Sequence, residues 1–314
     1  MLNFRELKKI KGDASIRKFY RNKNNRSIVV YANKDKVKNL LIYDAVNKIL
    51  NKNKILAPKL INQNYKNNYI EVEDFGDNTL FKVLKHNKTN KELFFRKILK
   101  TLSRLQLIKD KQVVNLNRQK YKVQKYDNKI LLNEAKLFSE WYATRKINKF
   151  KIRKFKKVFE NEVKKLLSKL NFKNDTFVHR DFHVSNLMYV KNNIAVIDSQ
   201  DALIGNKAYD LASLIDDVRF ETSNKLKNKI LNNYFKKLKK TEINKFVNDF
   251  EILSVLRNLK IIGIFMRLAS RDNKKKYVKM IPYAWQMINY RMKKNREFVN
   301  LKLILKRNFP KFVK

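Results

Sequence analysis

Cysteine is absent from this sequence and glycine is rare, and each scarcity excludes something. Without cysteine the chain has no disulfide framework, no zinc–thiolate site and no thiol nucleophile. Only four glycines occur, at Gly12, Gly76, Gly205 and Gly263, so we expect each where the backbone needs a positive φ or a close approach to another segment. No stretch reaches the roughly 18 uninterrupted apolar residues of a membrane span, and we expect no membrane association.

Acidic residues are also scarce. The chain has 28 Asp and Glu against 74 Lys and Arg, which leaves a net charge of +46. Such an excess is typical of proteins that bind nucleic acid or an anionic membrane surface. Here the basic residues are spread along the whole chain together with many asparagines, a bias that an AT-rich genome produces through its codons. We therefore expect no specific nucleic-acid partner, since such a protein would cluster Lys and Arg among aromatic residues.

Length and the first residues indicate the broad class. At 314 residues and 37.8 kDa the chain is long enough for two lobes or domains. The first 15 residues contain no apolar core of signal-peptide length. We expect a monomer in the cytoplasm, whose reducing conditions suit a chain without cysteine.

The stretch from Phe177 to Asp217 carries the strongest chemical signal. His179, Arg180 and Asp181 come first, Asn186 follows five residues after the aspartate, and Asp198 ends an apolar run. This order is typical of phosphoryl transfer from ATP, with Asp181 accepting the proton of an attacking hydroxyl and Asn186 and Asp198 holding Mg²⁺ on the phosphates. His179 is assigned to structural support of the site. An ordinary surface hairpin with aspartates in its turns would not need this spacing.

Strands are predicted around that loop. Residues 176–178 lead into it, and the β runs 187–190 and 194–197 follow it, separated only by a polar turn. Two such runs form a hairpin. The hairpin would bring Asn186 and Asp198 to the same end, close enough to share a cation.

The N-terminal part predicts a small, β-rich lobe. We expect strands over 16–21, 27–32, 59–63 and 69–73, and helices over 2–10 and 36–52. A turn followed by strands is how a kinase small lobe covers nucleotide phosphates. Ser15 and Arg17 are therefore predicted nucleotide contacts, although Arg17 and Lys18 are equally explained as solvated strand charges.

A hinge is predicted where the last of these strands ends. Glu73 closes the strand, and Phe75 and Gly76 lead into a helix over 79–86. The backbone of Glu73 and Phe75 is the predicted contact for adenine, and the glycine permits the bend. The alternative is a plain turn between a strand and a helix.

Beyond residue 90 the pattern is helical, over 92–108, 130–144, 153–170, 225–238, 242–270 and 276–294. Glu140 stands beside Trp141, an acid and a ring that together can contact a sugar. Asp210 is expected near a helix N-terminus, where exposed amides favour a carboxylate, and there it would brace the catalytic loop. Arg257 and Lys260 are expected to be solvated charges rather than substrate ligands.

The fold class that follows is α+β, a two-lobed protein-kinase-like fold. A small β-rich N-lobe is predicted over residues 1–76 and a large, mainly helical C-lobe over residues 77–314.

Taken together, the motifs resemble the aminoglycoside phosphotransferase family, which shares the protein-kinase-like fold. The segments that carry the resemblance read HRDFHVSNLM, IDSQDALIG and AYDLASL. Within that family the chain is similar to the bacterial N-acetylmuramate/N-acetylglucosamine anomeric kinases of cell-wall recycling, through residues 12–19, 73–77, 140–141, 197–202 and 258–268. All four glycines fall in matched segments.

The resemblance implies an ATP- and Mg²⁺-dependent kinase whose small-molecule substrate is an amino sugar. It implies Asp181 as the base, Asn186 and Asp198 as metal ligands, and Asp210 as the brace of the loop. Asp201 and Glu140 are the substrate contacts assigned on the same basis.

Two departures from the subgroup stand out. Ser199 occupies the place of a phenylalanine behind the metal site. The strand after Ser27 continues without the aspartate-alanine-proline turn of the subgroup, and Lys34 falls near the place where other kinases have a phosphate-binding lysine.

Other functions stay open at this point. The same site could phosphorylate an aminoglycoside, choline or another amino alcohol, which an acidic substrate pocket would favour. A noncatalytic nucleotide-binding pseudokinase would lose the base or a metal ligand, and this sequence has lost neither.

Overall fold

The chain divides into two compact units. The structure is a computed structural model and describes residues 7–10, 17–22, 24, 26–33, 37–86, 89–109, 111–114 and 120–313. The first unit comprises Met1–Gln124 and Phe177–Leu203, and the second comprises Lys125–Thr176 and Ile204–Lys314.

The first unit contains a five-stranded antiparallel sheet in the order β1-β2-β3-β5-β4. Its strands are β1 (Lys8–Ile10), β2 (Lys18–Asn22), β3 (Ser27–Tyr31), β4 (Leu60–Asn64) and β5 (Tyr69–Glu73). The last four confirm the predicted strands. The helix predicted over 2–10 is wrong at residues 8–10, because Lys8–Ile10 pairs with β2 and Ile10 lies opposite Phe19. Residues 2–6 of this prediction lie outside the described residues. Pairing at a sheet edge supplies backbone hydrogen bonds that an isolated nine-residue helix could not hold.

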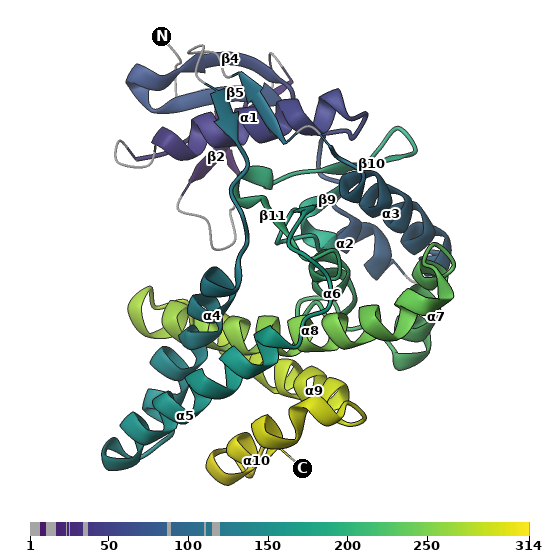
Figure 1. The fold of residues 1–314 in the computed structure, drawn as a ribbon. Helices are drawn as coiled ribbons and strands as arrows, with labels where there is room; N and C mark the ends of the chain where they lie inside the picture. The colour runs from purple at the N-terminus through teal and green to yellow at the C-terminus, as the bar shows by residue number, and fades with distance from the viewer. Residues whose placement is uncertain are drawn as a thin grey trace. The chain divides into compact units, whose positions relative to one another are not determined.

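Helix α1 (Val37–Lys52) lies alongside this sheet (Figure 1). Leu40 and Tyr43, one helical turn apart, form a buried cluster with Val30 of β3 and with Ile70 and Val72 of β5. The 3.6-residue period of the helix places these side chains on one face. The predicted helix over 36–52 is thereby confirmed, and its apolar face is fixed against the sheet.

The first unit also contains helices α2 (Leu80–Lys85) and α3 (Lys91–Gln106) and the antiparallel strand pairs β6 (Gln112–Val114) with β7 (Lys120–Lys122) and β9 (Leu187–Val190) with β10 (Asn193–Val196). The boundary between the two units falls within strand β8 (Thr176–Val178) and again within strand β11 (Leu203–Gly205). Thr79 caps α2 by accepting the backbone N–H of Lys82, and Asn90 caps α3 by accepting that of Leu93.

The second unit is helical. Its helices are α4 (Asn128–Leu137), α5 (Lys149–Ser168), α6 (Tyr209–Ile215), α7 (Asn224–Phe235), α8 (Lys240–Arg271), α9 (Ile281–Met292) and α10 (Val299–Asn308). Helix α8 contacts α4, α6 and α9 (Figure 1). Eight consecutive residues of α8, from Ile252 to Leu259, are buried, so this part of the helix is enclosed on all sides. Within the described part of the chain, no helix is both long and apolar enough to cross a lipid bilayer.

Gly263 allows α8 to approach the end of α4 closely. A Cβ atom at this position would lie 2.3 Å from the carbonyl carbon of Leu137 and 2.6 Å from the backbone nitrogen of Phe138. At this contact α4 gives way to a π-helical turn over Phe138–Tyr142, where a regular helix was predicted through residue 144. The expectation that a glycine marks a close backbone approach is confirmed here.

A buried ionic cluster joins the end of α6 to residues of α7, α8 and α9. Asp216 is fully buried and accepts hydrogen bonds from Lys227 Nζ at 3.0 Å, Ser254 Oγ at 2.6 Å and Arg291 Nε at 2.7 Å. Burial alone would raise the pKa of Asp216, but Arg291 and Lys227 outweigh it and hold this pKa well below its ordinary value. The carboxylate is therefore charged in the folded protein and joins three separate helices.

Replacing Gly263 with alanine should destabilise the protein. The added methyl group meets backbone atoms of Leu137, which cannot move aside as a flexible side chain would, and overpacking of this kind costs about 1–3 kcal/mol. Urea unfolding would measure the loss. The control is Gly76→Ala, which has a φ of +77° but nothing within 4 Å of the added atom, so its cost is limited to about 1–2 kcal/mol of backbone strain. A Gly263→Ala protein as stable as the wild type would contradict the close contact.

Asp216→Asn should lower the free energy of unfolding at pH 7 by about 3–5 kcal/mol, because it leaves two buried cations without a counter-charge. Since the folded-state pKa of Asp216 is depressed, its contribution is present above the unfolded pKa of about 4 and is lost as the pH falls through the folded-state pKa. The gap between wild type and variant should therefore narrow in acid. Asp272→Asn, which removes an exposed carboxylate, serves as the control with no resolvable change. A gap that stays constant with pH would exclude the charge of Asp216 as the cause.

Candidate functional site

The hairpin of β9 and β10 brings the predicted metal ligands together. The two strands are antiparallel, with Val196 opposite Leu187, and the N–H of Ile197 donates to the carbonyl of Asn186 at 3.1 Å. Asn186 and Asp198 therefore lie next to this closing hydrogen bond, at the same end of the hairpin. The predicted hairpin is confirmed, and so is the placement of the two residues at one end of it.

The loop between β8 and β9 is held by hydrogen bonds to its own backbone. Asn186 Nδ2 donates to the carbonyl of Asp181 at 3.1 Å, and the N–H of His183 donates to the same carbonyl at 3.0 Å. His179 is fully buried, with Nε2 3.1 Å from the carbonyl oxygen of Ile197. The backbone that carries Asp181 is thereby tied to Asn186, and the imidazole of His179 joins the loop to the end of β10.

Two non-glycine residues at this site have a left-handed backbone. Arg180 has a φ of +72° and Asp198 a φ of +62°. Such conformations cost about 1–3 kcal/mol each and persist where the surrounding structure enforces them, commonly at active sites. Arg180 Nη1 donates to the carbonyl of Asp201 at 3.1 Å, so the strained residue is anchored to the turn that follows Asp198.

Arg17 holds the carboxylate of Asp198. Its Nη2 atom lies 2.5 Å from Asp198 Oδ1, and its Nη1 atom donates to Gln200 Oε1 at 2.6 Å. The side chain of Arg17 is 6% exposed and that of Asp198 is 35% exposed. The guanidinium also lies 5.6 Å from the ring centroids of Phe19 and Tyr43. A buried arginine with two acceptors and two rings is a fixed part of the site, which excludes the interpretation of Arg17 as a solvated strand charge.

The environment of Tyr43 is apolar enough to keep its phenol neutral. Burial raises the pKa of Tyr43 to about 12, although the positive charge of Arg17 opposes the shift. The ring therefore presents a neutral face to the guanidinium.

Ser199 links the turn after Asp198 to helix α1. It is fully buried, and its Oγ donates to Asn47 Oδ1 at 2.6 Å, while Asn47 Nδ2 donates to the carbonyl of Pro58 at 3.0 Å. Where relatives were expected to have phenylalanine, this chain uses a buried polar link instead. The link satisfies both buried side chains, which unpaired would cost stability.

Asn47, Tyr43 and Gln200 are site residues that the sequence analysis missed. Asn47 and Tyr43 lie on α1, far in sequence from the loop between β8 and β9, and were predicted only as part of a helix. The signal available was the polar Asn47 next to Val46 on an otherwise apolar face. Gln200 stood inside the quoted motif, but no partner for it could be predicted without the fold.

The predicted hinge has the expected backbone. Strand β5 ends at Glu73, whose N–H donates to the carbonyl of Lys59 at 2.9 Å within the sheet. Gly76 has a φ of +77°, and its N–H donates to Asp74 Oδ1 at 2.8 Å, which forms the turn toward α2. Phe75 is half-buried between them. Of the other predicted nucleotide contacts, Ser15 lies outside the described residues.

The predicted substrate contacts are exposed, whereas the predicted brace is buried. Asp201 is exposed, and its Oδ2 accepts from Gln200 Nε2 at 2.8 Å. In the second unit Asp210 is 2% exposed in the first turn of α6, as predicted, and Glu140 is exposed in the π-helical turn.

The expectation that Arg257 and Lys260 are solvated is wrong. Arg257 is 4% exposed, and Lys260 Nζ lies 2.9 Å from the carboxylate of Glu134, with a side chain only 13% exposed. Both lie on α8, whose enclosure by α4, α6 and α9 could not be predicted from the spacing of its own residues.

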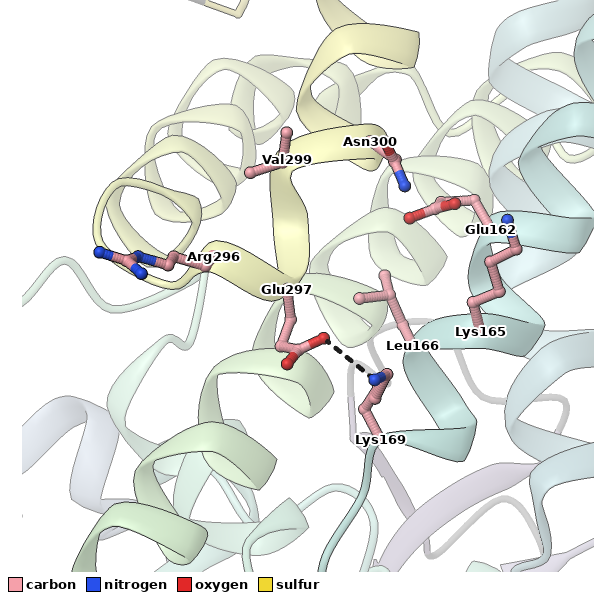
Figure 2. Close-up of a pocket in the computed structure, with 8 residues that line it drawn as sticks. All are labelled: Glu162, Lys165, Leu166, Lys169, Arg296, Glu297, Val299 and Asn300. Atoms are coloured by element: carbon pink, nitrogen blue, oxygen red, sulfur yellow. Dashed lines mark ion pairs between the residues drawn. The ribbon is translucent and has the colours of Figure 1, made fainter.

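A shallow hollow on the second unit contains none of the predicted site residues. It has a volume of about 250 Å³ and lies between α5, the turn Arg296–Phe298 and the start of α10. Figure 2 shows Glu297 pointing toward Lys169, with Nζ and Oε2 4.0 Å apart. An ion pair of this length at an exposed site contributes little.

The residues at the hairpin end fit a nucleotide-bound Mg²⁺ better than a metal held by protein alone. In the described ranges, no three His, Asp or Glu side chains form a group that could hold a metal ion. Mg²⁺ is commonly held by one or two carboxylates together with phosphates and water. With Asn186 Nδ2 engaged by Asp181, its Oδ1 and the carboxylate of Asp198 are the oxygens that this end offers.

Comparison with known proteins gives curated relatives of one name. The N-acetylmuramate/N-acetylglucosamine kinase of Neisseria meningitidis serogroup B is 34% identical over 182 residues, which cover 56% of this chain and 54% of that protein. The chain thus matches about half the length of this relative. The kinase of the same name from Pseudomonas aeruginosa is 27% identical over 307 residues, covering 94% of this chain and 86% of that protein.

Solved structures share the fold. A choline kinase from Cryptosporidium parvum aligns with a TM-score of 0.62 and 15% identity, over 98% of this chain and 94% of that chain. The ADP-bound aminoglycoside phosphotransferase APH(2'')-Ib aligns with a TM-score of 0.59 and 15% identity, over 90% and 94%. These likenesses confirm the predicted α+β, two-lobed protein-kinase-like fold.

A family model decides the classification. The model described as the phosphotransferase enzyme family, APH, matches residues 6–242, well over half of the chain. The match confirms the predicted family and the predicted class of enzyme, a kinase. It includes the sheet, the loop between β8 and β9, the hairpin and Asp198. On this extent of match, together with the shared fold, the chain belongs to the phosphotransferase enzyme family.

Proposed function

We propose that the protein transfers the γ-phosphoryl group of Mg²⁺-bound ATP to a hydroxyl of a small amino sugar, the anomeric hydroxyl of N-acetylmuramate or N-acetylglucosamine. The observation that carries this proposal is the end of the β9–β10 hairpin, where Asn186 and Asp198 adjoin the loop of Asp181. Phosphoryl transfer requires positioning and charge stabilisation more than covalent chemistry, and this site supplies fixed groups for both.

In this proposal Asp181 orients the acceptor hydroxyl and takes its proton. Proton transfer to a positioned base contributes typically about 10²–10⁴-fold to the rate. The hydrogen bonds from Asn186 and His183 to the Asp181 carbonyl fix the backbone from which the carboxylate projects. His179 supports the site by holding the Ile197 carbonyl.

Asn186 Oδ1 and the Asp198 carboxylate would hold Mg²⁺ against the phosphates of ATP. When bound, the ion offsets the negative charge of the phosphoryl group. The left-handed backbone of Asp198 and its contact with Arg17 keep this carboxylate in a defined place before the nucleotide arrives.

Further residues are proposed to contact the nucleotide or to support the loop of Asp181. The backbone of Glu73 and Phe75 would meet adenine, with the boundary of the predicted lobes at residue 76, and Ser15 would contact phosphate. Asp210, buried in the first turn of α6, would brace the loop. We further propose a monomer that works in the cytoplasm.

The identity of the acceptor substrate rests on the relatives and on charge. The amino-sugar assignment is supported by the name shared by the curated relatives. The net charge of +46 also attracts an anionic acceptor such as N-acetylmuramate more than a cationic one. Asp201 and Glu140 are the proposed substrate contacts. The fold shared with a choline kinase and an aminoglycoside phosphotransferase leaves an amino-alcohol acceptor as the second candidate.

The test is ADP release by the purified protein with Mg²⁺ and ATP on N-acetylmuramate, N-acetylglucosamine, glucose, choline and kanamycin, followed by phosphorus NMR of the product. Turnover of the N-acetyl sugars with an anomeric phosphate signal is expected. Turnover only on choline or kanamycin would overturn the acceptor, and no turnover on any with ATP bound would favour a noncatalytic protein.

Asp181→Asn tests the base in the same assay. Because the amide cannot accept the proton, we expect turnover to fall about 10³-fold while the affinity for ATP is unchanged. The matched control is Asp175→Asn, the same chemical change at an exposed aspartate before the loop, which should keep full turnover. Wild-type turnover in Asp181→Asn would remove Asp181 from the role of base.

A further inference from the structure

The third strand of the sheet carries no cation for the nucleotide phosphates. In protein kinases a lysine on this strand contacts the phosphates. Here β3 consists of Ser27, Ile28, Val29, Val30 and Tyr31. Lys34, the nearest candidate from the sequence, lies outside the described residues. Among the described residues, the phosphate-binding charge would therefore come from another element.

Arg17 is a buried cation that reaches the site from a different part of the sheet's unit. It stands directly before β2, next to the turn predicted to cover the phosphates, and its guanidinium contacts Asp198 and Gln200. Burial of an arginine is costly unless its charge is paired, and Asp198 provides that pairing. The planar guanidinium also has the geometry that suits two phosphate oxygens.

The pairing with Asp198 creates a competition. The Asp198 oxygen that lies 2.5 Å from Arg17 belongs to the carboxylate proposed to hold Mg²⁺. A guanidinium and a divalent cation on one carboxylate repel each other, whereas a phosphate attracts both. A nucleotide that arrives with Mg²⁺ therefore brings a new partner for each group: a phosphate for Arg17 and the metal ion for Asp198.

We propose that Arg17 is the phosphate-binding cation of this enzyme and that Asp198 holds it in place until the nucleotide binds. The inference rests on the proposed function. Binding of the nucleotide then exchanges partners: the guanidinium passes from the carboxylate to a phosphate, and the carboxylate becomes available to the metal. Without metal, Asp198 and the phosphates compete for Arg17. The contacts with Phe19, Tyr43 and Gln200 keep the guanidinium close during the exchange.

The competition is measured by binding of ADP in EDTA, where no turnover and no metal are involved. Asp198→Asn should tighten ADP binding about tenfold, because the guanidinium is no longer held by a charged partner. Removing a negative charge near the phosphates would also tighten binding without any role for Arg17. The same substitution is therefore made in an Arg17→Gln background, where we expect a change of less than about threefold.

Further variants separate the proposal from simpler explanations. Arg17→Gln should weaken ADP binding about tenfold and leave adenosine binding unchanged, because adenosine has no phosphate. Arg17→Lys keeps the charge and serves if the glutamine variant does not fold, as judged by thermal unfolding. The Arg17→Lys protein should retain part of the ADP affinity, and Asp198→Asn made in it should still tighten ADP binding in part.

The outcomes are distinct. An equal effect of Asp198→Asn in both backgrounds, or ADP affinity that does not depend on Arg17, would overturn the proposal while leaving the kinase assignment intact. Failure of the wild type to bind ADP with or without Mg²⁺ would instead overturn the proposed function.

Discussion

The structure of the site depends on one hydrogen bond, from the N–H of Ile197 to the carbonyl of Asn186. It closes the β9–β10 hairpin and fixes the register in which Asn186 and Asp198 share an end. A slip of one residue would turn the side chains of one strand to the other face of the hairpin and lose this pairing. The carbonyl group of Ile197, on the other side of the same residue, meets the buried His179, so the loop that carries Asp181 is attached at this point as well.

Scarce acidic residues are used in this protein as partners for buried cations. Asp198 pairs with Arg17 in the first unit, and Asp216 pairs with Lys227 and Arg291 in the second. The two pairs differ in a way that matters for function. The carboxylate of Asp216 is fully buried, whereas that of Asp198 is 35% exposed and so is accessible for the proposed exchange of one cation for another.

Local patterns predicted the hairpin, helix α1 and the positions of Asn186 and Asp198, because each follows from the period of its own residues. The same patterns could not predict contacts between distant segments. The bond from Ser199 to Asn47 spans 152 positions, and the burial of Arg257 depends on helices packed around α8. The predicted helix over 2–10 failed at residues 8–10 for the same reason, since pairing of Lys8–Ile10 with β2 overrides the local sequence pattern.

The central claim is that Asn186 and Asp198 form a single site for nucleotide-bound Mg²⁺. It is tested most directly by the gain in ADP affinity on adding Mg²⁺, compared between wild type and Asn186→Ala by calorimetry. The account predicts that Asn186→Ala loses most of this gain while its affinity in EDTA is unchanged. Asn193→Ala, at the exposed turn end of the same hairpin, should keep the gain. A full Mg²⁺-dependent gain in Asn186→Ala would contradict the account.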